Sequence, residues 1–362
     1  MIASRTIGAL LAAIAVVVAI AGLVSLLALL TGHDARAALD ALWTGSLGSS
    51  YAIFSATLVR ATPLMLTGLA VALAFTAGVW NIGAEGQLLA GATAATVVGL
   101  SAASVLGWAT WLVALVAGAA AGGAWAFLPA WLRRRFGVLE VISTIMMNFV
   151  ALYLVGYLVR GPLQEPLRIY PQSSTLPELA RLPTLAAGTR LHVGFLLALS
   201  CAGGLWWVFR STAAGFRVRA VGSNPDAARS AGMIDVRRTT MYAFVSSGAL
   251  AGLAGAVEVT GVTYSLYENL SPGYGYTAIA VALVASLQPV VTVFSGALFG
   301  ALEAGASAMQ RDAGIPSVLA TVVEASIIFL VLGGVAMRGA RFRVAIERRL
   351  RPPSPGQAPE SP

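Results

Sequence analysis

The chain has 362 residues, of which 58% are hydrophobic and only 10% are charged, and its mean hydropathy is +0.82. No soluble core could bury so much apolar surface, and the long unbroken apolar runs exclude a β-barrel, whose strands alternate outward and inward residues. All 23 basic residues are arginine and the net charge is +8, which in a membrane protein reflects the positive-inside rule and does not indicate nucleic-acid binding.

If each membrane crossing takes about 20 apolar residues, the sequence predicts an all-α polytopic membrane protein with about ten transmembrane helices. Residues 35–43 are expected to form a short amphipathic helix at the surface. The run 276–287 is unusually short, because Gln288 and Pro289 stop it. The expected spans are residues 7–30, 61–80, 87–105, 108–132, 138–159, 191–209, 239–264, 276–287, 290–309 and 315–337.

These spans make residues 1–337 one transmembrane domain, in which 160–190 and 210–238 are the long polar connections. Residues 338–362 are basic and then rich in proline, with too few apolar groups to fold alone, so a disordered tail is expected. With the N-terminus inside, 16 of the 23 arginines fall in inner segments and 7 in outer ones. The positive-inside rule therefore predicts that both termini are cytoplasmic.

A polar, glycine-containing segment, Asn81-Ile82-Gly83-Ala84-Glu85-Gly86-Gln87, separates two apolar runs. Backbone freed from a helix at membrane depth survives only against protein or water. The segment therefore indicates a polar path or a functional helix end, although an ordinary short loop is the alternative. A second such point, 268–275, precedes the short run 276–287, and interrupted helices in matching positions of two halves are typical of a transporter path.

Acidic residues lie within or beside the spans, where an unpaired carboxylate is costly. Glu85 could contact a solute directly, or it could satisfy freed N–H groups at a helix start. Glu140 is expected at a helix start, and it shares one helical face with Thr144 and Asn148. That polar stripe favours a position beside a pore, although hydrogen bonding between helices is the alternative. No role is assigned to Glu258, Glu303 or Glu324.

The 210–238 connection contains a short helix, expected at 225–231. Asn224 can cap its start, and Asp226 and Arg229 place opposite charges three residues apart. Gly232 can end it in a left-handed conformation. Elsewhere, glycines at spacings of three and four predict close helix packing, without deciding whether the partner helix belongs to the same chain. These glycines are Gly118, Gly122, Gly123, Gly248, Gly252, Gly255, Gly296 and Gly300.

Several kinds of chemistry are excluded by motif. The chain has no lysine and no phosphate-binding loop, and it lacks the His-Glu-x-x-His and Gly-x-Ser-x-Gly motifs. It is therefore not expected to be an enzyme or to hydrolyse ATP. Cys201 is the only cysteine, and His33 and His192 lie in no ligand cluster, so no metal site is expected and both histidines are predicted to be solvated at the interface.

Three blocks of sequence resemble one family of proteins. The three blocks look like motifs of permease subunits from nucleoside and simple-sugar ABC importers. They are residues 79–87, with the sequence Val-Trp-Asn-Ile-Gly-Ala-Glu-Gly-Gln, residues 137–148 and residues 220–232. These permeases belong to the branched-chain amino-acid/ribose permease superfamily. The resemblance implies the fold of a type II ABC importer permease, with two pseudo-symmetric halves, in the cytoplasmic membrane of a bacterium.

The same resemblance assigns roles to residues. It implies a substrate path that includes Asn81, Glu85, Gln87, Thr144 and Asn148. It also implies a coupling helix that docks on the ATPase and that includes Gly222, Asn224, Pro225, Asp226, Ala227, Arg229 and Gly232.

The resemblance implies ATP-driven import, with nucleosides as the expected solutes and a simple sugar of the ribose or galactose type as the alternative. The expected partners are a separate ATPase, which carries ATP and Mg²⁺, a second homologous permease and an extracytoplasmic solute-binding lipoprotein. No cofactor is expected in this chain. A proton-coupled carrier that uses Glu85, or an integral membrane enzyme, is the alternative from another class.

Overall fold

The computed structural model of the chain describes residues 18–230, 232, 234–316, 318, 321–322 and 325–326. The last expected span and the tail 338–362 lie largely or wholly outside these residues, as does the start of the first expected span. All regular secondary structure in these residues is helical, apart from three isolated β-bridges. The described part of the first expected span, Val18–Leu30, is helical. The labelled helices that follow are α2 (Ala35–Ser46), η1 (Ala52–Thr57), α3 (Leu58–Thr76), α4 (Ala84–Ser101), α5 (Ala103–Leu106), η2 (Gly107–Ala109), α6 (Thr110–Phe136), α7 (Glu140–Arg160), η3 (Glu178–Ala180), α8 (Gly194–Ser211), α9 (Ala213–Ser223), α10 (Pro225–Ser230), α11 (Val236–Glu258), η4 (Val259–Thr263), α12 (Tyr274–Val284) and α13 (Pro289–Asp312).

Six helical stretches of the described chain are long and apolar enough to cross a membrane. They correspond to six of the expected spans. Three further expected spans form helices that fall short of this standard within the described residues: the first is described only over Val18–Leu30, α4 begins with polar Glu85 and Gln87, and α12 has only 11 residues. The six stretches are Ala52–Thr76, Ala103–Phe136, Glu140–Arg160, Gly194–Ser211, Val236–Thr263 and Pro289–Asp312.

The expected span 61–80 is displaced toward the N-terminus, since the helix runs over Ala52–Thr76. Its end is set by the turn at Gly78, where φ is +73°. Glycine adopts this left-handed conformation without a steric penalty, so the chain leaves the helix before Trp80. The predicted surface helix at 35–43 is also longer, because α2 continues to Ser46 and buries Ala38 and Ala41.

Small residues hold the central helices together within the chain. A Cβ atom added to Gly252 of α11 would overlap the carbonyl oxygen of Gly118 in α6, and one added to Gly255 would overlap the carbonyl oxygen of Leu88 in α4. On the other side of the molecule a Cβ atom on Gly300 of α13 would lie 2.7 Å from the backbone nitrogen of Ala61. The predicted close packing is therefore confirmed, and it joins helices of the same chain.

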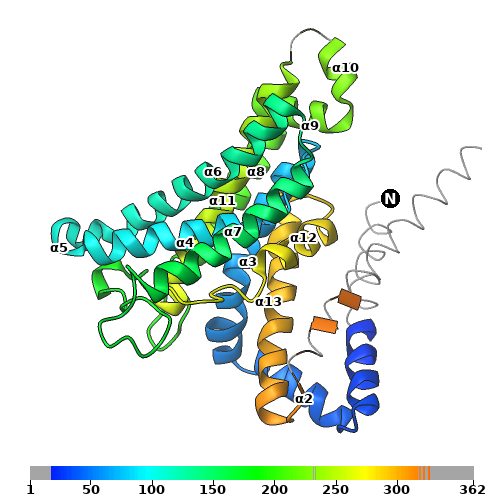
Figure 1. Ribbon diagram of the computed structural model, residues 1–362. Helices are drawn as coiled ribbons and strands as arrows, with labels where there is room; N and C mark the ends of the chain where they lie inside the picture. The colour runs from blue at the N-terminus through cyan, green and yellow to red at the C-terminus, as the bar shows by residue number, and fades with distance from the viewer. Residues whose placement is uncertain are drawn as a thin grey trace, which may run out of the picture.

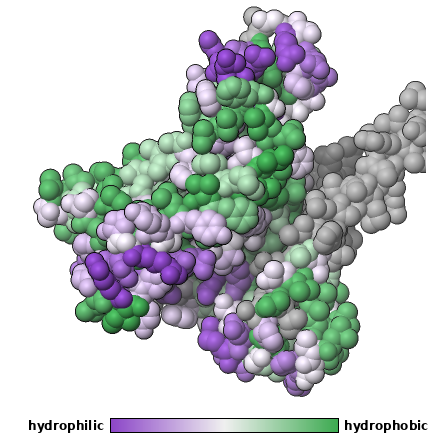
Figure 2. All heavy atoms as spheres, viewed as in Figure 1, coloured by the Kyte–Doolittle hydropathy of each residue, from purple (hydrophilic) through white to green (hydrophobic). Residues whose placement is uncertain are grey.

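The helices differ in how much of their surface is covered. In α3, 83% of the most apolar stretch is buried, whereas in α7 only 28% is buried, so α3 is central and α7 is peripheral. Figure 1 shows α9 and α10 projecting at one end of the molecule, with α2 and the connection after α7 toward the other. Figure 2 shows apolar surface between hydrophilic surfaces at these two ends, as expected for a membrane-spanning protein.

Candidate functional site

The Asn81–Gln87 segment forms a closed cluster of amide groups. Asn81 Nδ2 donates to Gln87 Oε1 at 2.9 Å, and Gln87 Nε2 donates back to Asn81 Oδ1 at 3.0 Å. Asn81 Nδ2 also donates to Ser247 Oγ of α11, and Asn81 Oδ1 accepts from the Gly83 N–H. Both amide side chains are at most 1% exposed. The segment Asn81–Gln87, which interrupts the helical chain between α3 and α4, is called the break below. It is held by its own side chains and by one hydroxyl group from another helix.

Asn148 of α7 closes the same segment from the other side. Its Oδ1 accepts from the Gly86 N–H at 2.9 Å, and its Nδ2 donates to the Ile82 carbonyl oxygen at 2.9 Å and to the Tyr276 hydroxyl at 3.3 Å. Thr144, one turn earlier, lies against Gly83, where an added Cβ would come within 3.0 Å of the Thr144 Cβ. The polar stripe of α7 therefore faces the break.

Glu85 connects the break to the start of α12. Its Oε2 accepts from the Gly275 N–H at 2.7 Å, and the hydroxyl of Ser271 also hydrogen-bonds the carboxylate. Gly275 is the second residue of α12, so the carboxylate lies where the helix dipole is positive. A helix of 11 residues is about 16 Å long, roughly half of the ~30 Å hydrocarbon core. A helix of this length cannot cross the hydrocarbon core alone, so in a membrane at least one of its two ends would lie inside the core.

The two polar, glycine-containing segments singled out in the sequence, 81–87 and 268–275, are in contact. A Cβ atom on Gly275 would overlap the backbone nitrogen of Glu85, so only glycine permits this approach. The N-terminal turns of α4 and α12 lie side by side at the contact. Two helix starts that converge within a membrane are an arrangement able to bind polar or anionic groups.

Glu140 occupies the helix start that was expected for it. It lies in the first turn of α7, where its Oε1 accepts from the Trp80 N–H at 3.4 Å. Its Oε2 pairs with Arg133 Nε at 3.4 Å. The carboxylate thus ties the end of α6 to the chain just before the break.

The connection 210–238, named the coupling loop after the role that the resemblance implies, has the local structure expected around Asn224. Asn224 Oδ1 accepts from the N–H groups of Asp226 and Ala227 at 3.1 and 3.0 Å, which caps α10. Asp226 pairs with Arg229 at 3.2 Å. The described part of α10 runs from Pro225 to Ser230, the expected last residue Ala231 lies outside the described residues, and Gly232 has a φ of +74°.

The coupling loop is also packed against the break. A Cβ atom on Gly222, near the end of α9, would overlap the carbonyl oxygen of Thr76, the last residue of α3. The Cβ position of Gly78 lies 3.3 Å from the Gly222 Cα atom. Backbone contact therefore joins α9 to the segment that leads into Asn81, so a displacement of α10 can reach the break through two adjacent helices.

Sequence reasoning missed three partners of the cluster. Ser247 and Tyr276 lie in apolar runs, and Ser271 lies in a polar connection, so none has a local signal of its role. His192 also differs from expectation, because it is fully buried against Gly194 and Gly261. Burial, with a smaller contribution from nearby Arg190, lowers the pKa of His192 to about 4. Among the described residues no group of three or more acidic, histidine or cysteine side chains could hold a metal ion. Glu324 lies outside the described residues.

Comparisons with known proteins agree with this architecture. The guanosine ABC transporter permease protein NupP of Bacillus subtilis is 40% identical over 321 residues, which is 87% of this chain and 90% of the relative. The glucose ABC transporter permease protein TsgB13 of Haloferax volcanii is 38% identical, over 81% of this chain and 79% of the relative. The nucleoside ABC transporter permease protein NupB of Lactococcus lactis is 33% identical, over 80% and 81%.

A second guanosine permease protein of Bacillus subtilis, NupQ, is 29% identical over 254 residues, 68% of this chain and 79% of the relative. No solved structure matches the chain. Residues 53–332 match the family described as branched-chain amino acid transport system / permease component. The chain belongs to this family: it is the membrane-spanning permease subunit of an ABC importer and not itself an enzyme.

Proposed function

We propose that this chain is the permease of an ATP-driven nucleoside importer, in which the contact between the starts of α4 and α12 opens and closes the solute path. The observation that supports this proposal is the buried hydrogen bond from Gly275 N–H to Glu85, made between the starts of α4 and α12. Two of the relatives described above are named for guanosine or nucleosides. About ten spans in two pseudo-symmetric halves are proposed, because the interruptions at 81–87 and 268–275 would occupy matching positions in the two halves.

Asn81, Glu85, Gln87, Thr144 and Asn148 are proposed to line the inner part of this path. The amides of Asn81 and Gln87 are engaged with each other in the described state. Their role there is to hold the wall of the closed path. When the path opens, the amide and carboxylate groups would exchange these internal bonds for bonds to water or to the solute.

The coupling loop is proposed to dock on a separate ATPase through Asn224, Pro225, Asp226, Ala227, Arg229 and Gly232. The first four of these residues are exposed, and so is Arg229. Force from the ATPase would pass from α10 to α9, and from Gly222 to the backbone at Thr76 and Gly78. Thr76 and Gly78 lie within five residues of Asn81 in the sequence. A movement caused by closure of the ATPase would therefore reach the break through a short stretch of backbone.

The proposed assembly contains an ATPase with bound ATP and Mg²⁺, a solute-binding lipoprotein and a second permease related to this one by a pseudo-twofold axis. Bacillus subtilis has two different guanosine permease proteins similar to this chain, which supports a heterodimer. The assembly would lie in a bacterial cytoplasmic membrane with both termini of this chain cytoplasmic. In that orientation α9 and α10 reach the cytoplasm, where an ATPase operates.

A sugar importer is the second candidate, because the chain is 38% identical to a glucose permease. The two are separated by uptake into proteoliposomes that contain the assembled transporter, with the lipoprotein outside. We expect ATP inside the vesicles to drive uptake of radiolabelled guanosine and adenosine but not of glucose. Glucose uptake would select the sugar importer, and uptake driven by a proton gradient without ATP would contradict both.

A further inference from the structure

A polar cavity lies beside the first turn of α12, and none of the contacts described above uses it. Its volume is about 280 Å³, and its lining includes Arg60, Arg190, Glu258, Tyr267 and Tyr274. These residues come from α3, from the connection before α8, from the last turn of α11, from the segment that leads into α12 and from the first residue of α12. Three parts of the chain that are distant in sequence, near residues 60, 190 and 258–274, thus converge on one space.

The backbone around the cavity is irregular in a specific way. The described residues contain two π-helices, η1 and η4, and both contribute to the lining, through Ser55 of η1 and through Val262 and Thr263 of η4. Short π-helical turns are rare and occur frequently at functional sites. Asn269, another lining residue, has a φ of +61°, which is uncommon for a residue other than glycine. Such conformations persist where the surroundings enforce them, often at ligand sites.

Glu258 is the distinctive group in this cavity. It is 3% exposed, and its Oε2 has no hydrogen-bond partner, whereas Glu85, which is also buried, is bonded to Gly275 and Ser271. No hydrogen bond or ion pair within the described chain joins Glu258 to either arginine of the cavity. Arg190 Nη2 instead donates to the Val262 carbonyl oxygen at 3.2 Å. A buried carboxylate oxygen without a donor is unfavourable unless a ligand supplies the donor.

We propose that this cavity binds the sugar part of the solute, through adjacent hydroxyl groups placed between Glu258 and the two arginines. A hydroxyl group both donates and accepts, so one can donate to the carboxylate while its neighbour accepts from a guanidinium. A charged ligand would match only one of the two signs of charge. The proposal rests on the proposed function, and it names the feature that a nucleoside and a hexose share.

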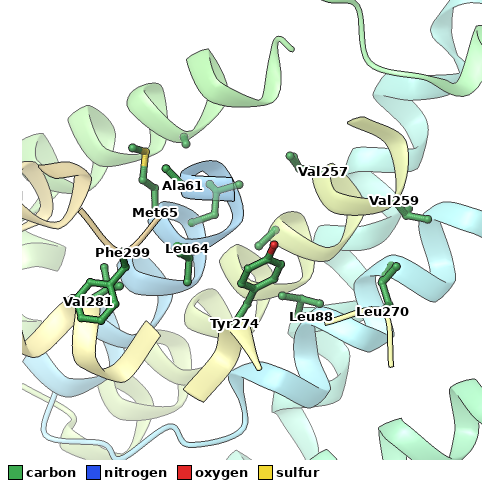
Figure 3. Packing of buried hydrophobic residues seen from close by; sticks show 14 of the residues in the cluster. Ala61, Leu64, Met65, Leu88, Val257, Val259, Leu270, Tyr274, Val281 and Phe299 are labelled. Atoms are coloured by element: carbon green, nitrogen blue, oxygen red, sulfur yellow. The ribbon is translucent and has the colours of Figure 1, made fainter. Parts of the chain in front are cut away.

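The position of Tyr274 connects this cavity to the break. Tyr274 lines the cavity, and the next residue, Gly275, is the one bonded to Glu85. Figure 3 shows the Tyr274 ring between Leu64 of α3 and Leu88 of α4, in one cluster of buried residues. The first turn of α12 therefore separates the cavity from the break. A shift of this turn that releases Glu85 would also change the cavity, so solute release and opening are coupled.

The test is equilibrium binding of radiolabelled guanosine to the purified permease–ATPase complex in lipid nanodiscs. The lipoprotein is left out, because it has a specificity of its own. The competitors are unlabelled guanosine and 2′,3′-dideoxyguanosine, which lacks the two hydroxyl groups. We expect the dideoxy compound to compete ~10–100-fold more weakly with the wild-type complex, as for the loss of hydrogen bonds to charged groups.

Glu258→Gln should weaken guanosine binding by ~10-fold or more and reduce the preference over the dideoxy compound to within ~3-fold, since the charge-assisted bond is lost. The amount of folded Glu258→Gln protein and its melting temperature should not fall, because the substitution removes the cost of burying an unpaired charge. A loss of stability would instead assign Glu258 to structure. Arg190→Gln should weaken binding in the same direction, and it decides the question if Glu258→Gln does not assemble. Glu178→Gln, at an exposed acid of the same connection, is the matched control.

The two proposals fail separately. If the complete transporter, with its lipoprotein, takes up neither nucleosides nor sugars, then the proposed function is wrong. If it takes up guanosine but Glu258→Gln and Arg190→Gln keep the wild-type affinity and preference, then only the assignment of this cavity is wrong.

Discussion

Two polar regions meet at the first turn of α12 and differ in how their groups are satisfied. In the break, the amides of Asn81, Gln87 and Asn148 all have partners within the protein. In the cavity, Glu258 has a buried oxygen without a donor. A saturated network rigidifies a structure, whereas an unsatisfied group has capacity for a ligand. The difference suggests that the break holds the path closed and that the cavity recognises the solute.

The claim that the hydrogen-bonded amides stabilise the break is tested most directly by removing one of these amides. Asn81→Ala leaves the Gln87 amide and the Gly83 N–H without partners, each at a cost of about 1–3 kcal/mol, whereas Ser247 keeps its hydrogen bond to the Ala70 carbonyl oxygen. We expect a loss of about 3 kcal/mol or more in the free energy of unfolding, seen as reduced folded protein and a lower melting temperature. Ser200→Ala, which removes a hydroxyl bonded only within its own helix, is the control. Equal melting temperatures for the two variants would show that the network carries little stability.

His192 gives a second test, because it is another buried group whose ring nitrogens lack partners and it lies near the cavity. Its folded-state pKa is about 4, below the ordinary value of 6.5. Between these values the unfolded chain binds a proton that the folded chain does not, so stability is complete above pH 6.5 and falls as the pH decreases toward 4. The loss at pH 4 is up to about 3 kcal/mol.

Melting temperatures between pH 7.5 and 4.5 would measure this effect, with His192→Gln as the reference that cannot titrate. The wild type should lose more stability than the variant over this range. Parallel curves would mean that His192 does not become unfavourable on protonation.

The contact between the coupling loop and the break can be tested by one methyl group. Gly222→Ala places a Cβ atom on the Thr76 carbonyl oxygen, and overpacking of this kind costs about 1–3 kcal/mol. Displacement of α9 should reduce uptake per folded transporter while ATP hydrolysis continues. Gly203→Ala, at a glycine with nothing within 4 Å of the added Cβ, should have no such effect. Coupled transport in Gly222→Ala would argue against this route.

Glu85→Gln should have the smallest effect on stability. The amide oxygen can still accept from the Gly275 N–H, and only the charge at the helix start is lost, about 0.3–1 kcal/mol and up to ~2 kcal/mol. Uptake should fall by more than the folded amount, because the strength of this bond sets the balance between closed and open states. Asp34→Asn removes a charge at the exposed start of α2 and serves as the control. Uptake that follows only the amount of folded protein would assign Glu85 to structure.

The sequence was sufficient to predict the apolar helices of the described residues and the break, because both depend on local signals, but it did not predict α9, which lies in a polar connection. Apolar runs locate the spans, and the polar residues between Asn81 and Gln87 stand out within them. The end at Thr76 was missed, since the apolar run continues past Gly78 and only the left-handed turn there stops the helix. The partners Ser247 and Tyr276 could not be predicted, because their roles depend on contacts between residues more than 100 positions apart.

The cavity shows the same limit more strongly. Glu258 was noticed as an acid near the end of a span, but its lack of a partner follows from how α3, α11 and the start of α12 pack together. The two π-helices likewise have no signature in the pattern of apolar residues. Close helix packing was predictable from the glycine spacing, whereas its location within one chain required the structure.

The most direct test of this account is guanosine binding per folded permease–ATPase complex, measured side by side for Glu85→Gln and Glu258→Gln. If the break closes the path and the cavity recognises the solute, Glu85→Gln should bind guanosine within ~3-fold of the wild type, whereas Glu258→Gln should bind ~10-fold or more weakly. Loss of binding in Glu85→Gln together with wild-type binding in Glu258→Gln would contradict the account, because it would place the solute at the break.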